Sequence, residues 1–399
     1  MSKSLIIGDL HLGKGTSLGK SGIGTTLNSR IVDQVESLAW IRDQASSLNA
    51  ETLIFTGDLF EDPKPDYVLV QIFIDFLKKC SDQMIEVHLI LGNHDLRRMG
   101  SYQISILDMI DSLDLDGIFV HKSIYTLHKN LVSFTFLPFC DRKSLHCSTH
   151  NDAVNELQQR MPFELAEIPY NNYKIIVGHL ALEGSIFVGD EIDDAANEIM
   201  CPSSLFNGYD YVWMGHVHKP QVLCKNPYIA HVGSVDISDF GETDHQKIMI
   251  FFDPLSVNKF TEIPIPNRQL RKISVSITDS KIDSTEAIIN QLSLHDKKKS
   301  LANSILKLEI KLEDILCKKP DRSLIEKKIN DLKVFHLARY IETKNVSVIP
   351  TIKKNDLIET SISPKVAVKL WAKKQKLSED IISDFIKISS EIIDKVAAK

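Results

Sequence analysis

The feature that most constrains the fold is a repeated unit in which an apolar run ends in glycine and a polar side chain. Residues 5–7, 52–56 and 86–91 form three such runs, followed by Gly-Asp, Gly-Asp and Gly-Asn. Segments with helical periodicity, over residues 26–47 and 66–79, separate them. Strands that alternate with helices in this way predict a parallel sheet, whose carboxyl-terminal edge collects ligand-binding side chains.

Further strand ends carry the same kind of residue. His179 follows the apolar run 174–177, and His216 and His218 follow the run 209–214. Asp9 and His11 are two residues apart, so an extended strand places them on the same side. The complete set of strand-end residues is Asp9, His11, Asp58, Asn93, His94, His179, His216 and His218. A single histidine of this kind is usually structural, but the recurrence of the pattern predicts a metal centre.

The remaining pattern predicts the domain organisation. Beyond residue 100 short strands dominate, which indicates two sheets packed face to face with helices outside. After Pro264 and Pro266 the order strand, helix, strand, helix, strand predicts a small second domain, and helices are expected over 364–376 and 378–396. The predicted division is therefore residues 1–264, 268–345 and 351–399.

Charge is distributed unevenly over these parts. The net charge is −6, but residues 267–399 hold 27 Lys and Arg against 18 Asp and Glu, a net of +9, and the first 266 residues have a net of −15. An acidic body suits divalent cations, and a basic C-terminal third suits phosphate. No apolar run approaches membrane-spanning length and no secretory signal is visible, so we expect a cytoplasmic protein without a membrane partner.

Two other sites are considered and rejected. Cys140, His146, Cys147 and His150 resemble zinc ligands, but nothing pairs with them at ligand spacing, and the six cysteines include no CxxC motif. The glycine-rich residues 13–24 lack the spacing of a phosphate-binding loop. We interpret them as a mobile loop beside the metal centre, without an assigned role.

The ligand chemistry predicts a pair of metal ions. Imidazole and carboxylate ligands without cysteine favour Mn²⁺ or Fe²⁺, with Mg²⁺ as a further alternative. Two ions that share a bridging carboxylate, for which Asp58 is the natural choice, suit in-line attack on a phosphoester. His94 is a candidate catalytic acid that stabilises the leaving oxygen, and Asp95 is expected to orient its ring.

These motifs resemble the calcineurin-like metallophosphoesterase superfamily, whose pattern is DxH, GD, GNHD, GH and GHxH. Here they are Asp9 with His11, Gly57 with Asp58, residues 92–95, Gly178 with His179, and residues 215–218. The resemblance implies an α+β fold, a two-sheet αββα sandwich followed by a small α/β capping domain and C-terminal helices. It also implies one ion held by Asp9, His11, Asp58 and His218 and another held by Asp58, Asn93, His179 and His216.

A narrower resemblance is to the SbcD-type DNA-repair nucleases. It rests on Gly233-Ser234 and Phe240-Gly241-Glu242 after the GHxH motif, on GDLF at 57–60, and on the order of the later domains. It implies a Mn²⁺-dependent nuclease with 3′ to 5′ double-strand exonuclease and single-strand endonuclease activity. It further implies DNA and an SbcC-type coiled-coil ATPase as partners, with a homodimer inside a heterotetramer; the dimer would form through helices near residues 66–79 and 101–113. A bacterial or bacteriophage origin fits the compact chain, in the latter case within the host cytoplasm.

Some features leave alternatives open. Many relatives carry histidine three residues after the bridging aspartate, where this chain has Glu61. Candidate DNA contacts are Arg97, Arg98, Lys297, Lys298 and Lys299. The arginine pair is equally a solvated loop, and a lysine run is usually one, so DNA contact by the lysines is favoured only by the basic C-terminal third. The alternative functions are a small-molecule phosphodiesterase or phosphatase on the same core, and a non-catalytic DNA-end scaffold.

Overall fold

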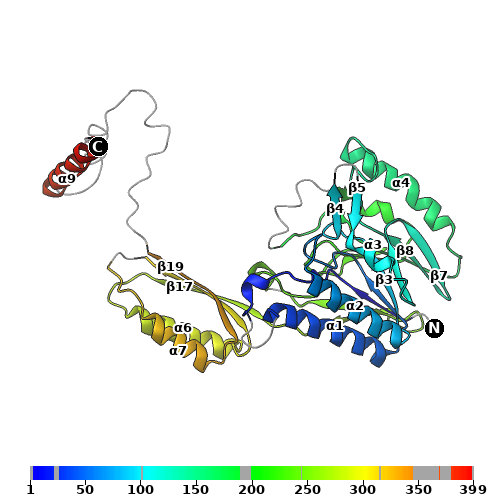
Figure 1. The fold of residues 1–399 in the computed structure, drawn as a ribbon, viewed down its shortest axis with the longest axis horizontal. Coiled ribbons are helices and arrows are strands. Elements are labelled where there is room, and N and C mark those ends of the chain that lie inside the picture. Colours follow the sequence, from blue (N-terminus) through cyan, green and yellow to red (C-terminus); the bar gives the residue numbers. More distant parts are fainter. Residues whose placement is uncertain are drawn as a thin grey trace. The chain divides into compact units, whose positions relative to one another are not determined.

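The structure is a computed structural model. It describes residues 3–21, 27–99, 102–188, 199–243, 245–313, 316–344, 368 and 379–397. The chain divides into two compact units, Met1–Lys344 and Asn345–Lys399, and each is described by itself. Figure 1 shows, in chain order from blue to red, the sandwich, the small sheet domain and the C-terminal helix.

Two six-stranded sheets form the body of the first unit. The first has the order β16-β15-β1-β2-β3-β6, with β1 parallel to β2, β2 to β3 and β3 to β6. Its strands are β1 Ser4–Ile7, β2 Thr52–Phe55, β3 Glu86–Ile90, β6 Ile118–His121, β15 Ile248–Phe252 and β16 Phe260–Pro264. The second has the order β13-β14-β12-β9-β8-β7. Its strands are β7 Tyr125–Lys129, β8 Val132–Leu137, β9 Tyr173–Gly178, β12 Tyr211–Met214, β13 Gln221–Lys225 and β14 Tyr228–His231.

Helices cover the outer face of each sheet. The helices of the sandwich are α1 Ser29–Leu48, α2 Tyr67–Asp82, α3 Ile106–Asp111 and α4 His150–Ala166. Helices α1, α2 and α3 pack on the first sheet and α4 packs on the second, as the membership of their two apolar cores shows. A third core lies between the sheets and takes Ile6, Ile54 and Ile90 from the first and Phe134, Val177 and Trp213 from the second. This arrangement is the predicted αββα sandwich.

The first strand shows why the sequence takes this form. Successive side chains alternate across a strand, so Leu5 and Ile7 enter the core under the helices and Ile6 enters the core between the sheets. Because both faces of β1 are covered, its sequence is a continuous apolar run rather than an alternating one.

The small domain follows β16. Its three-stranded parallel sheet has the order β17-β18-β19, with β17 Leu270–Ile277, β18 Ile305–Leu312 and β19 His336–Lys344. Helices α6, Ser284–Lys298, and α7, Arg322–Asp331, pack with it around a separate apolar core. Residues 1–344 nevertheless form one compact unit, so the three-way domain division stays a prediction.

Several expectations differ from the structure. Helix α4 was not expected in the strand-rich region; it is largely polar, and only Ala153, Leu157 and Met161 are buried. Residues 102–105, expected to be helical, form strand β5, Tyr102–Ser105, which pairs with β4, Leu96–Met99. The described part of the glycine-rich loop holds a short 3₁₀ helix, η1, Thr16–Leu18. Short connections complete the described elements: β10 Ala181–Leu182, β11 Met200–Cys201, η3 Ser203–Phe206 and η4 Phe240–Glu242.

The second unit contains helix α9, Glu379–Ala397. The helix expected over 364–376 falls outside the described residues except for Val368. Among the helices described, none has both the length and the apolar character needed to span a bilayer.

Candidate metal centre

The polar strand-end residues meet at one edge of the sandwich. Strands β1, β2 and β3 are parallel neighbours, so their carboxyl ends deliver Asp9, Asp58 and Asn93 side by side. Strands β9 and β12 are parallel neighbours in the facing sheet, and they deliver His179 and His216. The loops that leave these five strands carry all eight predicted residues.

The chain can bring these side chains together only by unusual backbone conformations. His11, Asp58 and His216 have φ values of 44°, 47° and 78°, in the left-handed region that side chains seldom adopt. The close packing of the loops also requires glycine at position 92, because a Cβ there would lie 2.1 Å from Asp58 Oδ1. Such concentrated strain is typical of functional sites.

The side chains form three overlapping groups whose ligand atoms lie within 4.8 Å of one another. The groups are Asp9, His11 and His218; His11, Asp58 and His94; and Asp58, His179 and His216. Asn93 joins the last of these, because its Oδ1 lies 2.8 Å from His179 Nε2 and 3.0 Å from His216 Nδ1. Asp58 thus belongs to groups on both sides of the centre.

This donor set fits divalent cations. His11 Nε2 and His218 Nε2 face each other at 2.9 Å, where two neutral imidazoles can share only one proton. Asp9 and His179 are completely buried and Asp58 nearly so. Buried carboxylates and imidazoles whose lone pairs converge are what a metal ion satisfies. Which ligand binds which ion stays a prediction.

The electrostatics of the two carboxylates differ. Burial raises the pKa of Asp58, but the imidazoles of His179 and His11 outweigh it and hold this pKa well below its usual range. Burial dominates at Asp9 and raises its pKa, with the neighbouring Asp58 acting in the same direction. Asp58 therefore stays ionised to a lower pH than Asp9 does.

His94 is held at the rim of this cluster. Its backbone N–H donates to Asp58 Oδ1 at 2.8 Å, and its ring Nδ1 lies 2.8 Å from the carbonyl oxygen of Glu61. Burial lowers the pKa of His94, but Asp58 and Glu61 outweigh it, so the pKa is raised. The ring is 28% exposed, which leaves an edge open to a substrate.

Asp95 has other partners than we predicted. Its carboxylate accepts backbone N–H groups from Leu59, Phe60 and Gly92 at 2.9 to 3.2 Å. It thereby fixes the two ligand loops after β2 and β3 against each other. The carbonyl of Glu61, rather than Asp95, contacts the His94 ring.

Glu61 also contacts the centre through its side chain. Its carboxylate lies 2.7 Å from His11 Nδ1 and 3.4 Å from Lys14 Nζ. Burial raises the pKa of Glu61, yet the interactions with His11 and Lys14 outweigh it and lower the pKa to about 2. A carboxylate on Nδ1 turns Nε2 of His11 toward the cluster.

A buried network behind His218 was not predicted from the sequence. Glu242 Oε1 lies 3.5 Å from His218 Nδ1, and the other oxygen of Glu242 pairs with Lys247 Nζ at 2.5 Å. Lys247 also donates to the His218 carbonyl oxygen at 3.0 Å and to Ser234 Oγ at 2.6 Å. The Phe-Gly-Glu motif contained the signal for Glu242, but a lysine just before an apolar strand gave none.

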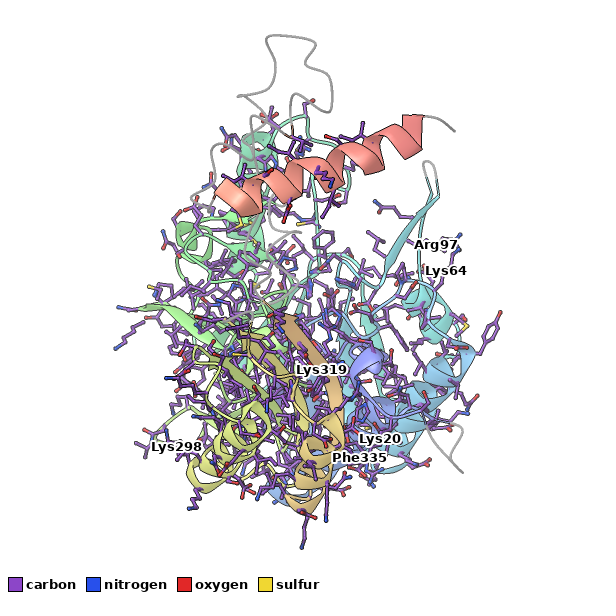
Figure 2. The ribbon with its side chains drawn as sticks, turned by 90° about the vertical axis from the view of Figure 1, so that its left-hand side faces the viewer. Lys20, Lys64, Arg97, Lys298, Lys319 and Phe335 are labelled. Atoms are coloured by element: carbon purple, nitrogen blue, oxygen red, sulfur yellow. The ribbon has the colours of Figure 1, made fainter. Side chains whose placement is uncertain are left out.

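The candidate DNA contacts do not gather at one place. Arg97 lies on strand β4, while Lys297 and Lys298 end helix α6 and Lys299 caps it. Figure 2 shows Arg97 far from Lys298. Arg98 pairs with Gln103 through the backbone, and its side chain lies outside what the structure describes. Lys297 and Lys298 are thus helical rather than part of a loop, Lys299 lies just beyond the helix, and all three lysines are exposed.

Comparisons with known proteins bear on this centre. Residues 2–220 match the family model described as Calcineurin-like phosphoesterase. The SbcD protein of the nuclease SbcCD from Staphylococcus epidermidis is 24% identical over 63% of this chain and 69% of its own length. The protein of the same name from Staphylococcus saprophyticus is 26% identical over 70% and 77%. The DNA double-strand break repair protein Mre11 of Methanopyrus kandleri is 25% identical over 54% of this chain and 44% of its own.

Proposed function

This chain belongs to the calcineurin-like phosphoesterase family, and from that premise we propose that it is a Mn²⁺-dependent DNA nuclease that works with an SbcC-type coiled-coil ATPase. The names of the relatives, two nuclease components and a double-strand break repair protein, support DNA as the substrate. The proposed reactions are 3′ to 5′ exonuclease cleavage of duplex ends and endonuclease cleavage of single strands.

One observation carries the proposal: Asp58 lies between a group containing His11 and a group containing His179 and His216. We assign Asp9, His11, Asp58 and His218 to one ion and Asp58, Asn93, His179 and His216 to the other. Such an ion pair, when bound, supplies an activated water and neutralises the charge of a phosphodiester.

His94 acts on the leaving oxygen. With Nδ1 of His94 directed at the Glu61 carbonyl oxygen, Nε2 is the nitrogen that meets the substrate. A proton held there stabilises the oxygen that leaves the phosphorus atom. Asp58 orients His94 by accepting its backbone N–H, so ligand and acid keep one relative position.

The parts outside the sandwich receive complementary roles. Residues 268–345 are proposed to cap the DNA, and their exposed lysines on α6 suit contact with the phosphate backbone. Residues 351–399, which include the amphipathic helix α9, are proposed to bind the ATPase. The homodimer within a heterotetramer belongs to the same proposal.

The test uses end-labelled linear duplex with Mn²⁺ or with EDTA, beside a generic phosphodiester dye. We expect Mn²⁺-dependent shortening of the duplex, lost in a His94→Ala variant. His128→Ala is the matched control, since His128 contacts Ser133 on the second sheet and not the metal centre. Cleavage of the dye with intact duplex, in the presence of a coiled-coil ATPase, would favour a small-molecule phosphodiesterase, and inactivity on both would favour a scaffold.

A further inference from the structure

The glycine-rich loop after His11 packs against the small domain. Leu18, in η1, is buried in a cluster separate from the main cores, together with Ile237 and Phe240 from the segment after the GHxH motif. Leu270 and Ile305, the first residues of β17 and β18, complete its buried part. The loop and the Phe-Gly-Glu segment thus form a seat for the base of the small domain.

A bidentate ion pair lies beside this apolar cluster and joins the small domain to helix α1. Arg268, just before β17, donates from Nε and Nη2 to the carboxylate of Asp33 on α1 at 2.8 to 3.0 Å. Its guanidinium lies 3.8 Å from the centroid of the Phe335 ring, and Lys20 Nζ lies 4.5 Å from that ring. Figure 2 shows Lys20 and Phe335 together where the loop meets the small domain. A bidentate pair fixes orientation as well as distance.

Through Arg30, Asp33 also connects Arg268 to the segment that follows the GHxH motif. It also accepts from Arg30 Nη1 at 2.7 Å, and the fully buried Arg30 donates to Asp236 at 2.5 Å and to the Ile237 carbonyl oxygen at 2.7 Å. The N–H of Val235, next to Asp236, donates to the carbonyl oxygen of Asp9 at 2.8 Å. These ionic and backbone contacts therefore anchor Arg268, and with it the small domain, to the segment beside Asp9.

The loop makes a second connection. Gln34, one residue after Asp33, accepts the N–H of Gly13 at 2.9 Å and donates to the carbonyl oxygen of His11 at 3.1 Å. Helix α1 thus holds the start of the loop through Gln34 and the small domain through Asp33.

We propose that Arg268 and Asp33 form a latch that sets the orientation of the small domain relative to the metal centre. Resting on the proposed function, the latch makes Arg268 a positioning residue for polymeric DNA, which touches both the metal centre and the small domain. A small phosphodiester touches only the metal centre and is indifferent to the latch. Loss of the latch is therefore expected to weaken the binding of duplex, because the chemistry at the metals is unchanged.

The test compares Arg268→Ala and Arg268→Lys with Lys272→Ala. Lys272 is the matched control, because its loss removes the same charge from the same domain, while its ion pair with Glu309 stays inside that domain. We expect KM for duplex to rise on the order of tenfold in Arg268→Ala, with kcat and the rate on bis-p-nitrophenyl phosphate unchanged. Arg268→Lys keeps the charge without the two-pronged geometry and is expected to follow Arg268→Ala.

Hydrogen exchange gives a readout that needs neither metal nor DNA. The amides of Leu18 and Gly19 are bonded within η1, and we expect them to exchange faster in Arg268→Ala than in the wild type or Lys272→Ala. Unchanged exchange would overturn the latch, as would equal loss in Lys272→Ala or equal loss on the small phosphodiester. A wild type that leaves duplex intact would refute the proposed function alone, since exchange still tests the latch.

Discussion

Lys247 lies completely buried behind the metal centre, and replacing it by methionine is a severe test of the network there. The Lys247→Met variant leaves the Glu242 carboxylate, itself 1% exposed, without its cation. Breaking a buried ion pair from one side costs about 3–5 kcal/mol. Glu242→Gln leaves the opposite charge unpaired, and we expect it to cost about 3 kcal/mol for the same reason.

The double variant decides whether pairing is the cause. Lys247→Met with Glu242→Gln removes both charges, and the glutamine side chain would retain the contact that Ser238 Oγ makes with Glu242 at 2.9 Å. We therefore expect the double variant to lose no more stability than one single variant, a coupling free energy of about 3 kcal/mol.

Urea denaturation in EDTA measures these free energies without a contribution from bound metal. If the stability loss of the double variant equals the sum of the two single losses to within about 0.5 kcal/mol, the reasoning is refuted, because independent sites behave in that way. Single-variant losses below about 1 kcal/mol would do the same, since most buried ion pairs cost more to break.

Two further predictions concern other parts of the first unit. Burial lowers the pKa of His121 to about 3, so this side chain alone makes the fold lose up to about 1.4 kcal/mol of stability per pH unit as the pH falls below about 6.5. His121→Phe should reduce the slope of urea midpoints between pH 7.5 and 5, and an unchanged slope would contradict this origin. In Gly92→Ala the new Cβ would lie 2.1 Å from Asp58 Oδ1, so we expect phosphodiesterase activity to fall on the order of 100-fold. Activity close to that of the wild type would show that the loop can move aside.

The convergence of the candidate metal ligands was predictable because it follows from topology. Asp9, Asp58 and Asn93 each end a strand of one parallel sheet, and the carboxyl ends of such strands must meet at one edge. The residue types then limited the chemistry to divalent metals. Both inferences need only local patterns and one general rule of sheets.

The supporting contacts could not be predicted in this way. Arg268 and Asp33 are 235 residues apart, and Arg30 and Asp236 are 206 apart, so no local periodicity relates them. Helix α4 was not predicted because only three of its residues are buried, so its apolar periodicity is weak. Asp95 was paired with its sequence neighbour His94, whereas the fold uses it for the backbone of two loops.

The number and coupling of the Mn²⁺ ions bound to the protein test the proposed metal centre directly. Metal analysis with electron paramagnetic resonance should find two ions per chain with an exchange-coupled spectrum, because the proposed centre shares Asp58 between them. The Asp58→Asn variant should lose the coupling, since an amide is a poor bridge. A single ion in the wild type, or a coupled pair that survives in Asp58→Asn, would contradict the proposed centre.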